Sequence, residues 1–467
     1  MQRIIVIGGG VAGAAVVGEL LRQGQPGAID LVWLVGGSAP GRGVAYATPV
    51  EHHLLNVRAA NMGLFADDAR SFVAHARSKG WPVQEQDFAP RAWFGDYVEA
   101  QLAREIKLAR ARGCAVRLLS VEARAVHANQ ARYQVVTDDG ETLHADGVVL
   151  AVGALPPEPL DTVSGSARAS GAFGADPWHW PVLARPPERV LVLGTGLSAV
   201  DVLQSAARLW PNAQLTAVSR HGRLPQSHAA VPACALAAPL AALQARPRLA
   251  YWLRELRKAG AAAQDWRALV DGLRSETQSL WQRLDTTERA RFLRHLRWVW
   301  ESLRHRLPPQ TAAEIARLRT QGRLKIVAGR VQSVDGDGPL NVRVRPRGAE
   351  STRNFVADLV IQATGLNLAV SVSTHPLMRQ LIDSGLVRAD ALDLGIATDA
   401  AGRVLRGDGT PTPGLRCLGT LLRGSLWECT GLPEIRTLAQ SIAGELTEEL
   451  HARAKGSAQD AVRVAVA

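Results

Sequence analysis

Apolar positions near the start of the chain follow a strand, turn, helix, strand order. Residues 4–7 are a continuous apolar run, as expected of a strand that is covered on both faces. A glycine-rich turn at 8–13 leads into an apolar helix at 14–21, and a second apolar run occupies 29–35. This unit is short enough for the right-handed crossover that joins two parallel strands. We therefore expect a parallel sheet in this part of the chain.

The same order returns in the middle of the chain. Residues 189–193 predict a strand, 194–199 a glycine turn, 200–209 a helix and 215–219 the next strand. Two copies of one supersecondary unit predict an α/β fold with two Rossmann-like dinucleotide-binding domains. Between about 237 and 322 the pattern is that of helices alone, so we also expect an all-helical insert.

The first glycine turn has the chemistry of a pyrophosphate site. Gly8 permits the tight turn, Gly10 lets the backbone approach a phosphate, and Gly13 lets helix and strand pack closely. The N–H groups at the start of the following helix can then bind the anion. An acid normally ends the second strand to hold the ribose, but Val35 is followed there by two glycines and Ser38. Ser38 or backbone groups are therefore expected to hold the ribose.

The second turn predicts the coenzyme that it binds. It contains Gly194 and Gly196, followed by Ser198 and by Ala199 in the place of the third glycine. Its second strand ends at Ser219 and is followed by Arg220 and His221, where NAD sites usually carry an acid. Arginine there suits a 2′-phosphate, so NADPH is favoured over NADH. A solvated basic turn is the alternative interpretation.

The motifs together resemble the two-dinucleotide-binding flavoproteins. More narrowly, the chain resembles a bacterial FAD–NAD(P)-binding family related to flavin-dependent N-monooxygenases such as aspartate N-monooxygenase. The narrower resemblance rests on short segments spread along most of the chain: 41–46, 54–59 with Met62, Pro90 and Arg91 with Phe94, Gly95 and Tyr97, 219–222, 426–428 and 433–436.

This resemblance implies the cofactors and several site residues. FAD would bind at the first turn and NADPH at the second. Residues 41–62 would line the isoalloxazine pocket, with Asn56 near the ring and with Asn56 and Arg58 as the candidate catalytic residues. The strands that close the two domains would reach the ligands at Gly153 and at Thr364 and Gly365. Glu428 would cover the other side of the ring, and a helix starting near Pro433 would direct its N-terminus at the flavin, where it stabilises negative charge.

The resulting domain organisation has six parts. They are an FAD-binding domain in two pieces (1–185 and 366–454), an NADPH-binding domain in two pieces (186–236 and 323–365), the helical insert (237–322) and a flexible tail (455–467).

Positive charge is concentrated in the predicted insert and in the residues just after it. The net charge of the chain is +11, and residues 240–330 hold 19 Lys and Arg against 8 Asp and Glu, which accounts for the whole surplus. Such a segment can be a solvated helical surface, a cap over the active site that attracts an acidic substrate, a partner surface or a membrane-facing surface. No recognised nucleic-acid module is present, so a nucleic-acid partner is not expected.

The remaining composition excludes other classes of protein. The 4 cysteines form no C-x-x-C pair, which argues against a metal site and against a dithiol reductase. No apolar stretch is long enough for a membrane span, and Arg3 leads directly into a core strand without a signal peptide. We therefore expect a cytoplasmic protein, and a homo-oligomer is compatible with the sequence.

Three functions fit these observations. The first is an NADPH-oxidising monooxygenase that uses O₂, through a flavin (hydro)peroxide, to hydroxylate the nitrogen of a small amine or amino acid, with an acidic one such as aspartate as a candidate. The second is an NADPH oxidase or reductase that passes electrons to O₂, a quinone or a protein. The third is a non-catalytic nucleotide-responsive sensor.

Overall fold

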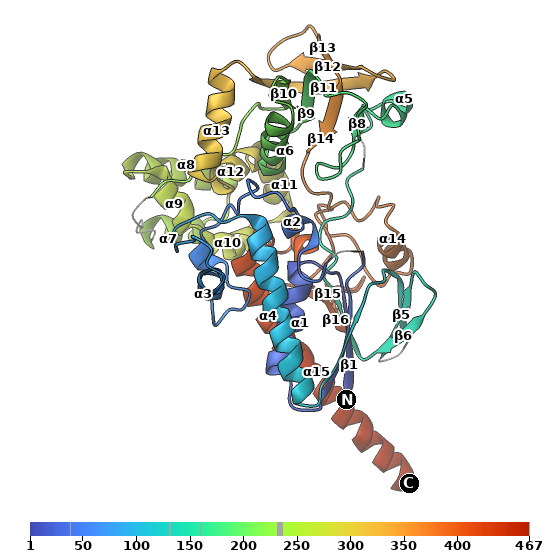
Figure 1. Ribbon diagram of the computed structural model, residues 1–467. Coiled ribbons are helices and arrows are strands. Elements are labelled where there is room, and N and C mark those ends of the chain that lie inside the picture. Colours follow the sequence, from blue (N-terminus) through green and yellow to red (C-terminus); the bar gives the residue numbers. More distant parts are fainter. Residues whose placement is uncertain (38, 130–131, 159, 231–236, 467) are drawn as a thin grey trace. The chain divides into compact units, whose positions relative to one another are not determined.

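The computed structural model describes residues 1–37, 39–129, 132–158, 160–230 and 237–466, and it divides the chain into two compact units (Figure 1). Unit 1 comprises Met1–Glu51, Val57–Leu155 and Leu368–Ala467. Unit 2 comprises His52–Asn56 and Pro156–Asn367. The predicted α/β fold with parallel sheets is confirmed in both units.

Unit 1 is built on a six-stranded sheet with the order β15-β16-β7-β1-β2-β3. All neighbours pair in parallel except β15 and β16, which pair antiparallel. The strands are β1 (Gln2–Ile7), β2 (Ile29–Leu34), β3 (Ala115–Leu119), β7 (Gly147–Leu150), β15 (Arg403–Leu405) and β16 (Pro411–Cys417). The apolar runs of β1, β2 and β7 are almost completely buried, as the sequence pattern predicts for strands covered on both faces.

Helices and a small sheet complete unit 1. Helix α1 (Val11–Gln23) packs against α4 (Arg91–Ala111) and α15 (Leu432–Val466). An antiparallel sheet of β4 (Ala123–Asn129), β5 (Arg132–Thr137) and β6 (Thr142–Ala145) packs against α14 (Pro376–Asp383). The short elements are α2 (Gly43–Tyr46), η1 (Ala59–Asn61), α3 (Ser71–Ser78) and η3 (Thr420–Leu422).

Unit 2 is built on a seven-stranded sheet with the order β13-β12-β11-β10-β9-β14-β8. Strands β8 to β11 and β14 pair in parallel, and β12 and β13 add an antiparallel edge. The strands are β8 (Phe173–Gly174), β9 (Arg189–Leu193), β10 (Gln214–Ser219), β11 (Leu324–Asp335), β12 (Leu340–Pro346), β13 (Arg353–Ala357) and β14 (Leu359–Gln362). Helices α5 (Gly165–Ala169), α6 (Leu197–Leu209) and α13 (Pro309–Thr320) accompany this sheet.

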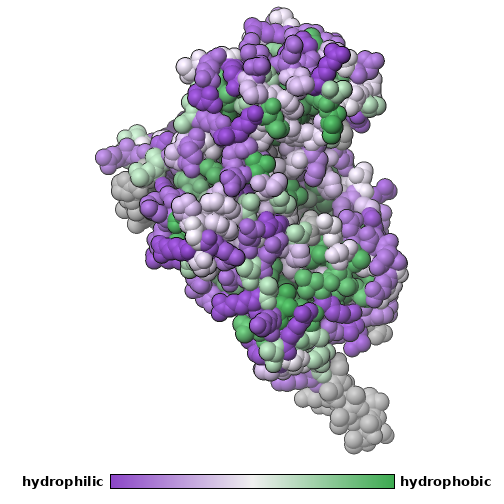
Figure 2. Space-filling model, in the orientation of Figure 1, coloured by the Kyte–Doolittle hydropathy of each residue, from purple (hydrophilic) through white to green (hydrophobic). Residues whose placement is uncertain are grey.

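The helical insert is part of unit 2. Its elements are α7 (Ala237–Ala245), α8 (Leu249–Ala262), α9 (Trp266–Gly272), η2 (Arg274–Glu276), α10 (Thr277–Arg283), α11 (Thr286–His295) and α12 (Arg297–Arg304). Two of these helices begin at an aspartate N-cap, where Asp265 accepts from the Arg267 N–H and Asp285 from the Glu288 N–H. The described surface of the chain in Figure 2 mixes hydrophilic and hydrophobic residues.

The observed boundaries differ from the predicted ones at several places. Helix α13 was predicted as part of the insert, but its Ile315 and Leu318 are buried in one core cluster with residues of α6 and β9. Residues 156–185, predicted as part of the first domain, belong to unit 2 because β8 pairs with β14. The last helix runs to Val466, into the segment 455–467 that was predicted as a flexible tail, because the residues after Leu450 include no proline and many good helix formers. None of the described helices is long and apolar enough to cross a membrane.

Two histidines of unit 2 contact one hydroxyl group of α6. Nε2 of His52 and Nε2 of His53 lie 3.1 Å and 2.8 Å from the Ser205 hydroxyl of α6. Burial, followed by the neighbouring His53 and Arg208, lowers the pKa of His52 to about 4. The folded chain therefore keeps His52 neutral at a pH where the unfolded chain protonates it, below about 6.5.

We expect the free energy of unfolding to fall as pH drops from about 6.5 to about 4, because protons bind the unfolded state there. The contribution of His52 is on the order of 1–2 kcal/mol after allowance for solvent screening. Urea unfolding at both ends of this range should show a smaller pH dependence for His52→Gln. The exposed His127 of unit 1 provides the control, and an equal change in His127→Gln would contradict the assignment.

Candidate functional site

The first glycine turn joins β1 to α1 in unit 1. Gly8 has a φ of +122° and donates its N–H to the Leu34 carbonyl at 2.9 Å. A Cβ at Gly8 would lie 2.2 Å from the Ala151 carbonyl oxygen, and a Cβ at Gly13 would lie 2.1 Å from the Gly8 carbonyl oxygen. The folded chain itself therefore requires glycine at both positions.

Gly10 is different, because the chain does not require a glycine there. Its φ of −82° and ψ of −177° suit any residue, and the nearest atom to an added Cβ is the Gly43 Cα at 3.8 Å. Gly10 is also the N-cap of α1, and no side chain caps the helix. The first N–H groups of α1 can thus bind an anion that approaches the backbone at Gly10.

The second turn repeats this geometry in unit 2. Gly194 has a φ of +132°, and its Cβ would lie 2.1 Å from the Ala363 carbonyl oxygen. Gly196 has a φ of −77° and a ψ of −170°, with nothing within 4 Å of an added Cβ. Ser198 lies in the first turn of α6, which no side chain caps, and Ala199 is fully buried where the first turn has Gly13. Both turns therefore have, at the start of a helix, a glycine where an added Cβ would meet no clash.

A closing strand ends beside each turn. Ala151 follows β7 and donates its N–H to the Ile7 carbonyl, and Ala363 follows β14 and donates to the Leu193 carbonyl, both at 2.8 Å. Gly153 has a φ of +72° and Gly365 a φ of +102°, and neither has an atom within 4 Å of an added Cβ. The structure thus brings Gly8 beside the segment that leads to Gly153, and Gly194 beside the segment with Thr364 and Gly365.

Two segments that carried the family resemblance, 41–46 and the one that includes Phe94, are joined by side-chain contacts in unit 1. Arg42 binds Asp96 and Glu99 of α4, and these carboxylates raise the pKa of its guanidinium. The Tyr46 ring lies edge-on to Phe94, with 4.6 Å between ring centroids. These contacts fix the loop that lies over Gly10.

The start of α15 is joined by hydrogen bonds to the residues on either side of Met62. Arg436 donates from Nη1 to the Gly63 carbonyl at 2.9 Å and to the Asn61 carbonyl at 3.3 Å. Pro433 lies in the first turn of α15, and the side chain of Glu428, which precedes this helix, is buried. All of these residues belong to unit 1.

The candidate catalytic residues fall in different units. The Asn56 carbonyl lies 3.0 Å from Nε2 of His228 in unit 2. Arg58 belongs to unit 1, donates to the Gln86 carbonyl at 2.8 Å and lies 5.3 Å from the Phe88 ring centroid. These contacts give Arg58 a structural role, and the catalytic roles of both residues stay predictions. Ser38, predicted at the ribose, lies outside the described residues.

The turn after β10 carries the predicted basic residues. Thr195 donates its hydroxyl to the Arg223 carbonyl at 2.6 Å, and the Ser219 hydroxyl accepts from the Gly222 N–H at 3.0 Å. The His221 ring stacks on Trp298 of α12, with 4.1 Å between ring centroids. Burial, followed by Arg347, Arg220 and Arg223, lowers the pKa of His221. The sequence pointed to this turn but not to Trp298.

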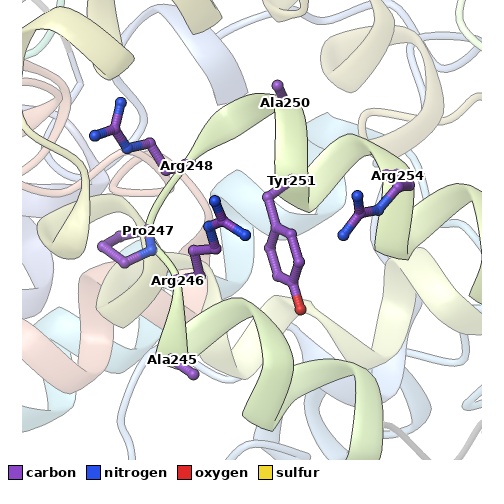
Figure 3. Close-up of a pocket in the computed structure, with 7 residues that line it drawn as sticks. All are labelled: Ala245, Arg246, Pro247, Arg248, Ala250, Tyr251 and Arg254. Carbon is purple, nitrogen blue, oxygen red and sulfur yellow. The ribbon is translucent and has the colours of Figure 1, made fainter.

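The insert also forms an open hollow of about 700 Å³ (Figure 3). Its lining is Ala245, Arg246, Pro247, Arg248, Ala250, Tyr251 and Arg254. The guanidinium groups of Arg246 and Arg254 lie 5.3 Å and 4.9 Å from the Tyr251 ring centroid. A hollow with three arginines can attract an anion, in keeping with the charge surplus of this segment.

Comparisons with known proteins support the predicted resemblance. Residues 5–155 match the model of a family described as FAD-NAD(P)-binding. No curated protein matches the sequence. Among solved structures, the chain is similar to the ornithine N-hydroxylase of Kutzneria sp. 744, solved with reduced FAD, NADP⁺ and L-ornithine, at 15% identity and a TM-score of 0.67 over 96% of this chain and 99% of the other.

Two further structures match over the same share of this chain. Ornithine hydroxylase from Pseudomonas aeruginosa has 15% identity and a TM-score of 0.64 over 99% of its chain, and L-lysine 6-monooxygenase from Pseudomonas syringae has 16% and 0.61 over 100%. Residues 5–155 therefore match an FAD-NAD(P)-binding family, and the chain shares the fold of these three enzymes.

Proposed function

We propose that this protein is an FAD-dependent monooxygenase that oxidises NADPH and hydroxylates the nitrogen of a small amine or amino acid. The observation that carries the proposal is the pair of turns at which the chain itself does not require Gly10 or Gly196. A glycine that the protein does not need, at an uncapped helix start, is explained by a ligand pyrophosphate that must approach the protein backbone closely. One such turn lies in each unit, which suits two dinucleotides.

Unit 1 would hold FAD. The N–H groups at the start of α1 would bind its pyrophosphate beside Gly10, and Gly153 would leave room where the closing strand reaches the ligand. Glu428 and the start of α15 at Pro433 would lie toward the flavin, where a helix N-terminus stabilises the charge of its reduced form. FAD supplies the capacity to accept hydride from NADPH and to activate O₂.

Unit 2 would hold NADPH. The start of α6, with Gly196, Ser198 and Ala199, would bind the pyrophosphate, and Thr364 and Gly365 would lie on the other side of the turn. Arg220 and His221 would face the adenosine end. An arginine after the second strand suits the 2′-phosphate, and this supports NADPH over NADH.

Among small amines and amino acids, we favour a substrate that carries at least one carboxylate beside the amine to be oxidised. The hydroxylases of similar fold are named for ornithine and lysine, and both are amino acids. The Arg-lined hollow of the insert and its surplus of positive charge favour an acidic amino acid such as aspartate among the candidates.

A substrate screen tests this function. NADPH consumption by the FAD-loaded protein should be slow alone and should rise at least about tenfold with the true substrate, because a coupled monooxygenase consumes NADPH only as product forms. Aspartate, glutamate, ornithine, lysine and simple amines form the panel, and mass spectrometry should find a product with one added oxygen atom.

The alternative functions predict other results. Rapid NADPH consumption without substrate, matched by hydrogen peroxide, would indicate an oxidase. Reduction of a quinone or a protein acceptor without oxygenated product would indicate a reductase. Binding of NADPH without any turnover would indicate a sensor.

A further inference from the structure

The turn after β10 and the end of β12 both contact Ala328 of β11. Together these two segments of unit 2 carry a cluster of basic residues. Ser219, the last residue of β10, pairs with Ala328, and Arg220 follows it directly. A Cβ on Gly222 would lie 2.9 Å from the Ala328 Cβ and 3.0 Å from its Cα, so the turn after β10 lies against this residue. Arg347, which follows β12, donates its backbone N–H to the Ala328 carbonyl at 2.9 Å. The hairpin of β12 therefore brings Arg347 to the turn of Arg220.

The charges of this cluster are not balanced by neighbouring acids. Arg220, Arg223 and Arg347 are all exposed. Within the described ranges, none of the three forms an ion pair with a carboxylate. The same three arginines act on His221, although burial is the larger cause of its lowered pKa. Like charges gathered without a counter-charge repel one another, and a bound anion removes this cost.

The helical insert holds this turn in place. Trp298 of α12 stacks on His221 with an interplanar angle of 17°, and the Arg223 guanidinium lies 4.8 Å from the Trp298 ring centroid. The backbone of the turn is fixed from the other direction, because the Thr195 hydroxyl of the glycine turn donates to the Arg223 carbonyl. The cluster is thus connected both to the insert and to the second glycine turn.

We infer that Arg347 and Trp298 complete a phosphomonoester subsite for the 2′-phosphate of the coenzyme. Arg347 supplies a cation beside Arg220 and Arg223, and Trp298 is a positioning residue that orients Arg223 and His221. The inference rests on the proposed use of NADPH by unit 2. It gives the insert a part in coenzyme selection, in addition to any role toward the substrate.

Adenosine phosphates test the subsite without turnover. We expect calorimetry on the FAD-loaded protein to show tighter binding of 2′,5′-ADP than of 5′-AMP. Arg347→Gln should weaken 2′,5′-ADP by about tenfold, the effect of one charge-assisted contact, and leave 5′-AMP unchanged. Arg319→Gln is the matched control: it removes an exposed arginine from α13 of the same unit and should change neither affinity.

Trp298 is tested by the same ratio of affinities. Trp298→Ala should reduce the preference for 2′,5′-ADP by about threefold to fivefold, because Arg223 loses its stacking partner, and Trp298→Phe should retain most of it. Equal losses for both ligands in Trp298→Ala would overturn the positioning role.

The outcomes separate this inference from the proposed function. A wild-type preference for 2′,5′-ADP that persists in Arg347→Gln would overturn the subsite and leave NADPH as the coenzyme. Equal wild-type affinity for both ligands would overturn the subsite together with the proposed preference for NADPH.

Discussion

Gly10→Val is expected to give a folded protein that is purified without FAD, whereas Gly196→Val should keep its FAD and lose most of its affinity for NADPH. Both glycines have extended backbone angles that valine adopts readily, and neither has a protein atom within 3.5 Å of an added Cβ. The added methyl groups would occupy the space where the pyrophosphate must approach the start of α1 or α6. The flavin content per chain and the Michaelis constant for NADPH measure the two effects.

We expect Gly10→Val to reduce flavin content to a trace and Gly196→Val to raise the Michaelis constant for NADPH at least about tenfold, corresponding to about 1.4 kcal/mol of binding. Gly407→Val in unit 1 and Gly165→Val in unit 2 are the controls, since an added Cβ meets nothing within 4 Å at either glycine. Both controls should retain FAD and coenzyme binding. Normal flavin content in Gly10→Val would show that FAD does not bind at the first turn.

The features that could be predicted from the sequence are local ones. Each glycine turn lies between a buried strand and a helix, so its geometry depends on neighbouring residues and on φ angles that only glycine readily adopts. The closing strands were also recognisable, because Ala151 and Ala363 follow short apolar runs of the kind that central strands require.

Features that depend on the path of the chain could not be predicted in this way. The apolar positions of α13 resemble those of the insert helices, and only the contacts of Ile315 and Leu318 assign it to the core of unit 2. Trp298 was one of several tryptophans among arginines, and its stacking on His221 joins segments far apart in the sequence. The roles of Asn56 and Arg58 came from resemblance alone, and a resemblance gives no contact with a substrate.

The glycines that the chain itself requires should respond in the opposite way to those that a ligand requires. Gly194→Ala is expected to destabilise the protein by about 3 kcal/mol or more, through strain at a positive φ and a backbone clash. Its Cβ would lie 2.1 Å from the Ala363 carbonyl oxygen, where β9 and β14 are joined by the hydrogen bond from Ala363 to Leu193. The position of a Cβ does not depend on any side-chain torsion, so no rotamer change can relieve its contact with a main-chain oxygen. The end of β14 would therefore have to move.

Gly196→Ala is the matched comparison, two residues away. Its φ of −77° suits alanine and its Cβ meets no protein atom, so we expect its free energy of unfolding to stay within about 1 kcal/mol of the wild type. Urea unfolding of the two variants, followed by tryptophan fluorescence, measures the difference. Equal stability of Gly194→Ala and Gly196→Ala would mean that Gly194 does not lie as close to the Ala363 carbonyl at the end of β14 as the structure indicates. A large difference, together with weak NADPH binding by Gly196→Val, would separate the glycine that folds the turn from the glycine that admits the coenzyme.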